Sequence, residues 1–290
     1  MYLCNMTHFM VQHPRQKLTM EEVKHDYLKT EKAKPLLAKL QQIFECFDAD
    51  SLFVDTLREY HAEMSLSCLL VSDKQYKQVH LAVENAKNAL EEFFGTTECV
   101  FVKTTDVYVK GSGSTGGGAP NAFSYALPGN NPIIVINSGL VDLMNEGELQ
   151  AAILHELGHI LYTHTKYASS MKMLFEMLSD GSLVHEAMAE CDMQQYNQIR
   201  VGYELTADRV MFLGMNQTEG GWAVIQNMFA KVAGGVKKID VNGNEFLQQY
   251  QRVDPNMRDA VCALMQQKNP HPPLLRRLFL LDEFRQTITP

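Results

Sequence analysis

The 290-residue sequence is poor in cysteine, in long apolar runs and in positive charge. Its six cysteines are scattered and form no Cys-x-x-Cys pair, which argues against a cysteine-based zinc site and predicts reduced, mostly buried thiols. The net charge of -8 gives no sign of a nucleic-acid footprint, which would need basic patches. No stretch approaches the roughly 18 uninterrupted apolar residues of a membrane span, and the N-terminus lacks the pattern of a signal peptide. We therefore expect a soluble, cytoplasmic protein with no nucleic-acid partner and no integral membrane segment.

The first third of the chain has the periodicity of helices. Thr19 followed by Glu22 is a capping-box signature at a helix start, and Pro35 is expected to break or kink the helical segment that follows. A second helix is predicted from a capping Asp73 to Gly95, a residue suited to a helix end. Its apolar stripe has helical spacing and consists of Val79, Ala82, Val83, Ala86, Ala89 and Leu90. We expect a helical layer that packs against the rest of the chain.

The middle of the chain changes to the pattern of strands. Residues 99–110 ("CVFVKTTDVYVK") are rich in β-branched and aromatic side chains, and "NAFSYAL" and "PIIVIN" predict two further strands joined by the turn-rich "PGNN". The glycine-rich "GSGSTGGG" between them has two interpretations, a phosphate-binding loop or a flexible loop. It lacks the lysine followed by Ser/Thr that ends a P-loop, and this absence favours a flexible loop. From residue 147 onward the pattern is helical, and this segregated order predicts an α+β fold.

A "HELGH" motif lies on a strongly apolar helical segment. His155 and His159 are four residues apart and therefore share one helix face, as two ligands of one metal require. Glu156 lies beside the first histidine and can act as a general base on a zinc-bound water without being a ligand. The alternative is an ordinary amphipathic helix, but burying these polar residues among apolar flanks would be costly. Gly158, a poor helix former, indicates the close approach of another backbone.

The third ligand decides the class of metal site. A metzincin would have a glycine at position 162 and a histidine at position 165, and this chain has neither. His164 is one residue early, and we expect it to face away from the site. The later "YELTADRV" offers Glu204 and Asp208 on one helix face. We predict Glu204 as the third ligand and Asp208 as the acceptor of a hydrogen bond from the far nitrogen of His155; two solvated carboxylates are the alternative.

With these residues in place, the sequence resembles the HtpX/CAAX-prenyl-protease type of gluzincin metallopeptidases. Four segments carry the resemblance, in the family's order: "NAFSYAL", "IIVINSGLVDLMNEGELQAAILHELGHI", "ELTAD" and "HPPLLRRL". We expect an α+β, mostly helical fold in which a small sheet with antiparallel edges packs on the active-site helix, with one Zn2+ per chain. A helical N-terminal region over residues 1–95 would pack on the catalytic core, and residues 96–290 would form the metallopeptidase domain.

The resemblance implies an activity and further site residues. The chain would be a soluble zinc-dependent endopeptidase that acts on peptides or unfolded proteins, with Glu156 as its general base. His271 would approach the metal from the far side and stabilise the oxyanion, and Arg277, or in its place Arg276, would brace the site. An edge strand would pair with the extended substrate through Asn121, Ala122 and Phe123.

The chain departs from the family pattern in two places. It has none of the transmembrane helices of the membrane-bound branches, which argues against membrane-protein or prenylated substrates. Residues 1–95 match no known pattern, so they either complete the fold, which we favour, or cover the cleft. A non-catalytic or latent metal-stabilised module that binds peptides or proteins is the alternative function. Glu156 favours the enzyme, because a structural zinc site closes its fourth position with a protein ligand and has no use for a base.

Overall fold

The structure is a computed structural model of the chain. The residues that it describes are 18–48, 51–114, 116–126, 131–165, 193–216, 219–235, 241–268 and 271–288. Residues 128–130 of the turn predicted over 128–131 lie outside this part of the chain. Across the described ranges, no helix combines the length and the apolar character that crossing a bilayer requires.

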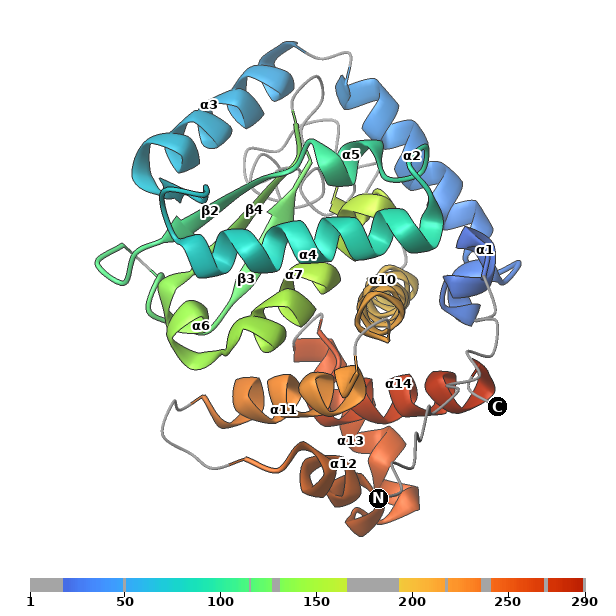
Figure 1. The fold of residues 1–290 in the computed structure, drawn as a ribbon. Helices are drawn as coiled ribbons and strands as arrows, with labels where there is room; N and C mark the ends of the chain where they lie inside the picture. The colour runs from blue at the N-terminus through green and yellow to red at the C-terminus, as the bar shows by residue number, and fades with distance from the viewer. Residues whose placement is uncertain are drawn as a thin grey trace, which may run out of the picture.

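Helices dominate the described residues (Figure 1). The N-terminal half contains α1 (Met20–Val23), the 3-10 helix η1 (Asp26–Lys29), α2 (Lys34–Asp48), α3 (Ser51–Ser67), β1 (Leu69–Leu70), α4 (Lys77–Phe94), α5 (Val100–Lys103), β2 (Asp106–Lys110), β3 (Ala122–Tyr125), β4 (Ile133–Asn137) and α6 (Ser138–Leu143). The C-terminal half contains α7 (Glu146–Leu161), α10 (Met193–Met215), α11 (Gly221–Gly234), α12 (Gly243–Arg252), α13 (Pro255–Lys268) and α14 (Leu274–Ile288). The predicted α+β, mostly helical fold class is confirmed.

The strands form one mixed sheet in the order β1-β2-β4-β3. The two central strands run parallel, and each outer strand is antiparallel to its neighbour, as predicted. Strand β4 is buried along its whole length, which suits a central strand with both faces covered. Strand β3 lies at the edge of the sheet, beside helix α7.

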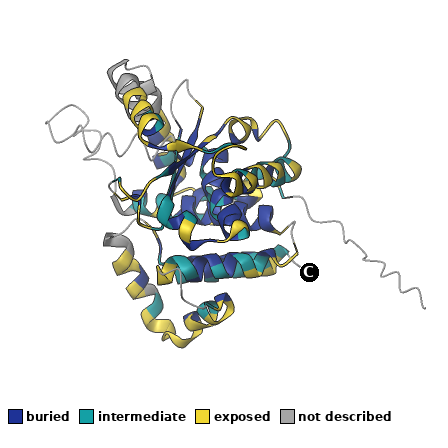
Figure 2. Ribbon diagram, turned by 60° about the vertical axis from the view of Figure 1, so that its left-hand side comes forward, coloured by how far each residue is buried: buried dark blue, intermediate teal, exposed yellow. Residues whose placement is uncertain are grey.

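Helix α7 lies at the centre of the molecule (Figure 1). It packs against α4, α10, α11 and strand β3. Its side chains Ile153, Leu154 and Leu157 are almost completely buried in the main hydrophobic core. Figure 2 shows the buried residues gathered where the sheet and the central helices meet, with exposed residues on the outer helix faces. Burial of this apolar surface holds α7 firmly among its neighbours.

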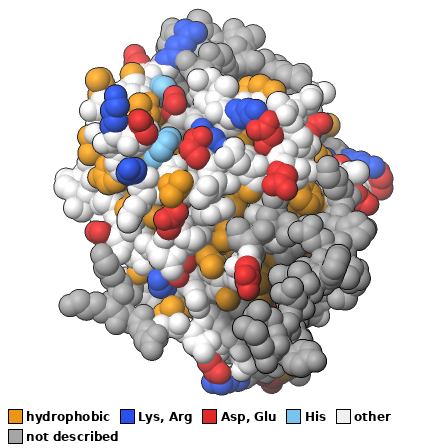
Figure 3. Space-filling model, in the orientation of Figure 1, with side chains coloured by type: hydrophobic (Ala, Val, Ile, Leu, Met, Phe, Trp, Pro, Cys, Tyr) orange, Lys and Arg blue, Asp and Glu red, His pale blue; other side chains and the backbone are white. Residues whose placement is uncertain are grey.

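The surface carries charges of both signs. On the face seen in Figure 3, the described lysine and arginine side chains are interspersed with carboxylates and form no large basic patch.

The predicted ends of the early helices are partly confirmed. The capping box is present, since the Thr19 hydroxyl accepts from the Glu22 N–H while the Glu22 carboxylate accepts from the Thr19 N–H. Gly95 ends α4 with a φ of 96°, a conformation that favours glycine. Pro35 lies in the first turn of α2, and the helical segment is broken before it, which is one of the two predicted outcomes. The proline is tolerated in this first turn because its missing N–H is not needed there.

Two other boundaries were predicted wrongly. Helix α4 begins after Tyr76 and not at Asp73, because residues 72–75 form a hydrogen-bonded turn. The strand predicted over residues 99–110 is a strand only from Asp106, after the short helix α5. Cys99 and Val102 are completely buried, and their spacing of three fits a helical turn better than the alternation of a strand.

The cysteines agree with the reduced state predicted for them. Cys68, Cys99 and Cys262 are free and buried. Burial, followed by nearby carboxylates, raises the pKa of Cys99 to about 11, so this thiol stays protonated at neutral pH. These three side chains therefore behave as small apolar core residues.

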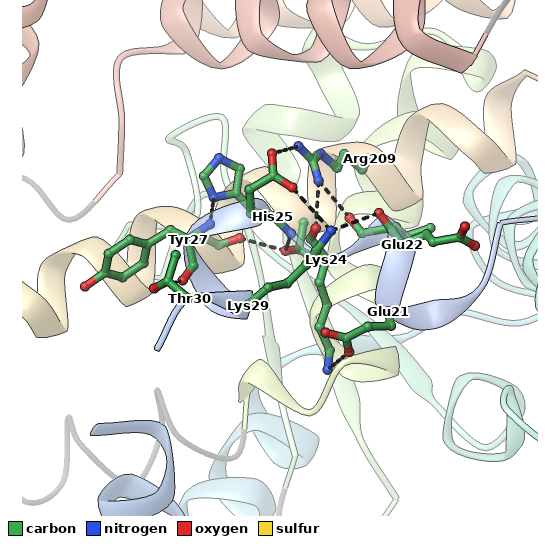
Figure 4. Close-up of polar contacts among 12 residues, drawn as sticks. Glu21, Glu22, Lys24, His25, Tyr27, Lys29, Thr30 and Arg209 are labelled. Atoms are coloured by element: carbon green, nitrogen blue, oxygen red, sulfur yellow. Dashed lines mark hydrogen bonds and ion pairs between the residues drawn. The ribbon is translucent and has the colours of Figure 1, made fainter. Parts of the chain in front are cut away.

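Residues 19–30, here called the N-terminal clamp, lie against helix α10 (Figure 4). The His25 N–H donates to the Thr206 hydroxyl over 3.0 Å. The Arg209 guanidinium donates to the Lys24 carbonyl over 2.7 Å. The clamp is therefore attached to the middle of α10 by direct hydrogen bonds.

Candidate metal centre

The helix that carries "HELGH" begins at a second capping box. The Asn145 side chain accepts from the Glu148 N–H over 2.9 Å, and the Glu148 carboxylate accepts from the Asn145 N–H over 2.8 Å. The buried Glu148 also accepts from the Lys231 ammonium over 2.6 Å, which joins the start of α7 to α11. The start of the helix is thus held in place about two turns before the first histidine.

Gly158 allows α10 to approach α7 closely. A Cβ at position 158 would lie 3.1 Å from both the Ala207 Cα and the Val210 Cβ. The approach of another backbone predicted from this glycine is therefore confirmed. It brings Glu204, one helical turn before Ala207, within reach of the histidines on α7.

His155, His159 and Glu204 form a triangle of metal-binding atoms. The two histidine Nε2 atoms are 3.2 Å apart, and each lies 3.5 Å from a Glu204 carboxylate oxygen. Zinc at its usual bond lengths, with tetrahedral angles, places neighbouring donor atoms about 3.3 Å apart. The spacing and the chemistry of the three donors therefore fit one zinc ion.

A buried ion network supports the triangle from one side. The Asp208 carboxylate accepts from His155 Nδ1 over 3.0 Å. Arg277 donates to Asp208 through Nε over 2.8 Å and through Nη2 over 2.6 Å, and its Nη1 lies 3.0 Å from Glu204. A hydrogen bond on the far nitrogen of a ligand histidine orients the ring and raises its basicity.

The network keeps its carboxylates charged. Burial acts to raise the pKa of Glu204, but Arg277 and then the neighbouring histidines hold that pKa well below its usual value. Burial opposes charge on Asp208 in the same way, and the Arg277 guanidinium again lowers the pKa. The site thus presents an anionic ligand together with an anionic hydrogen-bond acceptor.

His164 lies against the site, so the expectation that it faces away is wrong. Its Nδ1 is 3.2 Å from His159 Nδ1, and the side chain is buried. The expectation assumed that the helix continues through residue 164. Instead α7 ends at Leu161, and Thr163 adopts a left-handed conformation with a φ of 58°. The chain turns there and brings His164 back beneath His159.

Glu156 lines the same cleft as the ligand triangle and contacts strand β3. Its carboxylate accepts from the Ser124 hydroxyl over 2.8 Å. Burial raises the pKa of Glu156, and His155 and then this hydrogen bond oppose the rise. A carboxyl group with a raised pKa suits general base and acid chemistry. Ser124 was missed in the sequence, although it lies within the "NAFSYAL" segment.

The triangle opens into a cleft of about 720 Å³. Asn121, Ala122 and Phe123 line it along the free edge of the sheet. His271 lines it from the other side, and its Nδ1 lies 3.1 Å from a Glu204 oxygen. Arg277 also lines the cleft. The structure thus brings every predicted site residue to this cleft or to its supporting network.

Two imidazoles from one helix and a carboxylate from a second helix, beside a sheet edge, form the donor set of the His2Glu class of zinc hydrolases. Sequence comparison narrows this class to a family. Residues 101–285 match peptidase family M48, and the chain belongs to this family. Metalloproteases of the family use zinc.

Several curated proteins are similar to this chain. A plastoglobule-localized metallopeptidase of the chloroplast from Arabidopsis thaliana is 28% identical over 179 residues, which are 58% of this chain and 48% of that protein. A protease HtpX from a Psychrobacter strain is 28% identical over 80 residues, 28% of this chain and 26% of that protein. A protease HtpX homolog from Dictyoglomus turgidum is 35% identical over 66 residues, 22% of each chain. The chain thus spans at most about half the length of these relatives, and no solved structure is significantly similar to it.

Proposed function

We propose that this chain is a zinc-dependent endopeptidase that cleaves peptides or unfolded proteins in the cleft beside strand β3. The observation that carries the proposal is the separation of roles on α7. His155 and His159 point to the Glu204 carboxylate, whereas Glu156, between them in the sequence, is held by Ser124 at the sheet edge. A metal site that only stabilises a fold has no use for such a carboxylate.

The residues of the site have distinct roles in this proposal. Zinc held by His155, His159 and Glu204 would polarise the substrate carbonyl and acidify water. Glu156 takes the proton of the attacking water and returns it to the leaving amine. Ser124 keeps that carboxylate at the sheet edge, where the scissile bond would lie.

Two further groups would act on the substrate. His271 lies at the mouth of the cleft, with 56% of its side chain exposed, and can donate a hydrogen bond to the developing oxyanion. Asn121, Ala122 and Phe123 belong to the edge of the sheet, where an extended peptide can add as a further strand. Such backbone recognition favours unfolded chains over folded ones, because a folded chain has its backbone groups already paired.

The decisive experiment compares zinc content with proteolysis. Zinc per chain is measured first, and cleavage of unfolded casein is then assayed for the wild type, Glu156→Gln and Glu92→Gln, an exposed glutamate on α4. We expect zinc in all three proteins and cleavage in the wild type and Glu92→Gln only. Cleavage by Glu156→Gln at the rate of the wild type would refute the role of Glu156 as the general base. Bound zinc with no cleavage by any of them would favour the metal-stabilised binding module.

The third ligand is tested by metal affinity. Glu204→Ala removes a donor atom, and we expect it to lose most of the bound zinc at equal total zinc. Asp208→Ala removes the support of His155 and one ion-pair partner of Arg277, but no metal ligand, and we expect a weakening of about 10–100-fold. Unchanged zinc retention by Glu204→Ala would mean that another group is the third ligand.

The location of the chain and its division at residue 95 remain part of the proposal. A cytoplasmic location is our expectation, and the Arabidopsis relative is named for the chloroplast plastoglobule. Strand β1 and helix α4, both before residue 96, pack on strand β2 and helix α7. Expression of residues 96–290 without the preceding region would test whether that part folds by itself.

A further inference from the structure

The two histidines of the candidate metal centre have different supports. His155 donates through Nδ1 to the carboxylate of Asp208, over 3.0 Å. His159 has its Nδ1 3.2 Å from another imidazole, the Nδ1 of His164. One ligand is thus supported by an anion within an ion network, and the other by an aromatic ring.

His164 is held tightly in place. Its ring stacks on the Tyr203 ring, with 4.0 Å between centroids and 18° between planes, and more loosely on Tyr162, at 5.7 Å and 28°. Only 4% of the residue is exposed. The Tyr162 hydroxyl donates to the Met20 carbonyl of the N-terminal clamp over 2.7 Å, which fixes one side of the stack. Such a stack sets the plane and the direction of the His164 ring.

The distance between the two Nδ1 atoms restricts where the protons lie. His159 can bind a metal through Nε2 only if its ring is neutral and its proton is on Nδ1. That N–H then needs an acceptor, because an unpaired buried donor costs free energy. The nearby Nδ1 of His164 can accept only when it carries a lone pair, which places the His164 proton on Nε2.

We propose that His164 is a positioning residue, which holds the ring of His159 in the orientation and tautomer that bind the metal by accepting a hydrogen bond at Nδ1. The inference rests on the metal centre of the proposed function. In this role His164 acts through His159 and is not itself a ligand of the metal. Because its support is uncharged, it adds no further anion to a site that already holds the carboxylates of Glu204, Asp208 and Glu156.

Three substitutions separate the hydrogen bond from the packing. In His164→Asn the side-chain oxygen can occupy the place of Nδ1 and still accept. In His164→Gln the amide reaches the place of Nε2 instead, so a group of the same polarity no longer meets His159. His164→Phe keeps an aromatic ring between the tyrosines but has no acceptor. His80→Phe, at a half-buried position of α4 that does not line the cleft, is the control for loss of a histidine elsewhere.

The experiment measures zinc dissociation constants by competition with a chelator and visible absorption spectra of the cobalt(II) proteins. We expect zinc affinity about 10–100-fold weaker in His164→Gln and His164→Phe. We expect affinity close to wild type in His164→Asn and His80→Phe. The cobalt spectrum should change in the first two and be retained in the second two, which loss of packing alone would not produce.

The outcomes separate this inference from the proposed function. A wild-type chain that binds no zinc would overturn both. A wild-type chain that binds zinc as tightly as His164→Gln and His164→Phe would overturn the role of His164 alone. Equal weakening in His164→Asn and His164→Gln would also overturn it, because the position of the acceptor would then not matter. Thermal unfolding of each variant identifies any that fails to fold. If His164→Phe does not fold, the comparison of His164→Asn with His164→Gln still tests the inference.

Discussion

The two sides of helix α10 hold their neighbours by different means. On the side that faces α7, Glu204 and Asp208 are paired with Arg277, and all three side chains are at most 10% exposed. On the other side, Thr206 and Arg209 bind the N-terminal clamp mainly through its backbone N–H and carbonyl groups. One side is a buried ion network, and the other is a set of part-buried hydrogen bonds.

This difference follows from what each side has to bind. A carboxylate that is to bind a metal must stay charged in a dry site, and a buried charge is tolerable only beside an opposite charge. The clamp offers mainly backbone dipoles, so a single cation suffices, with hydrogen bonds to carbonyl groups and one longer ion pair to Asp26 at 3.7 Å. We therefore expect substitutions on the metal side to be more damaging to stability than equivalent substitutions on the clamp side.

The largest effect is expected for Arg277→Met. Methionine leaves two buried carboxylates without their cation, and removing one partner of such a pair typically destabilises a protein by about 3–5 kcal/mol. Urea-induced unfolding in the presence of a chelator measures this loss without a contribution from bound metal. A decrease in the free energy of unfolding below about 1 kcal/mol, the value of an exposed ion pair, would contradict the proposed difference between the two sides of α10.

The next effect is a pH dependence on the clamp side. Burial, followed by the charge of Arg209, lowers the pKa of His25 from 6.5 to about 4. Between these values the unfolded chain binds a proton that the folded chain does not, so the free energy of unfolding falls as pH falls from 6.5 to 4. The loss amounts to about 3 kcal/mol at 1.36 kcal/mol for each unit of pKa.

His25→Asn tests this pH dependence. Asparagine can still accept from the Tyr27 N–H at the start of η1, as the His25 ring does, but it does not titrate. We expect equal stability of the two proteins at pH 8 and a shallower acid loss in His25→Asn, measured by urea unfolding at several pH values. Parallel curves between pH 6.5 and 4 would show that His25 does not couple the clamp to pH.

Arg209→Met is the counterpart of Arg277→Met on the clamp side. It keeps an apolar side chain over the Phe284 ring but removes the hydrogen bonds to the Val23 and Lys24 carbonyls. We expect a loss of about 2 kcal/mol, in the range for hydrogen bonds that involve a charged group. A loss equal to that of Arg277→Met in the same unfolding assay would mean that the two sides do not differ.

The smallest effect is expected where the clamp packs on α10. A Cβ added at Gly202 would lie 2.8 Å from the Cγ and Cδ2 atoms of Leu28. Gly202→Ala should therefore lose about 1 kcal/mol, since an overpacking cost of about 1–3 kcal/mol exceeds the gain of about 1 kcal/mol in helix propensity. In a double-mutant cycle, Leu28→Ala should relieve that loss; strict additivity would contradict the contact.

Much of the fold could be predicted because its signals are local. The capping box at Thr19, the helix end at Gly95 and the two strands around residue 130 depend on residues close together in the chain. The strand predicted at residue 100 is a helix in the structure. Its β-branched residues favour a strand, but Cys99 and Val102 both pack into the core one helical turn apart, and this packing outweighs the intrinsic propensity.

In the candidate site, too, the contacts between residues close in sequence could be predicted and the contacts between separate elements could not. The pairs His155 with His159 and Glu204 with Asp208 follow from the helical period alone. Ser124 and His164 do not, because each depends on where two elements meet. The contact of Ser124 with Glu156 requires strand β3 to lie beside α7, and that of His164 with His159 requires the turn at Thr163.

By itself, the sequence determined the donor atoms proposed for the candidate metal centre and their spacing within each helix, because helix geometry converts residue spacing directly into position. Only the tertiary structure decided which face of each helix meets the other, which carboxylate is held at the sheet edge and which ring supports His159. Those contacts depend on the close approach of α7 and α10 at Gly158 and on the burial of the side chains around it, and no local pattern specifies either.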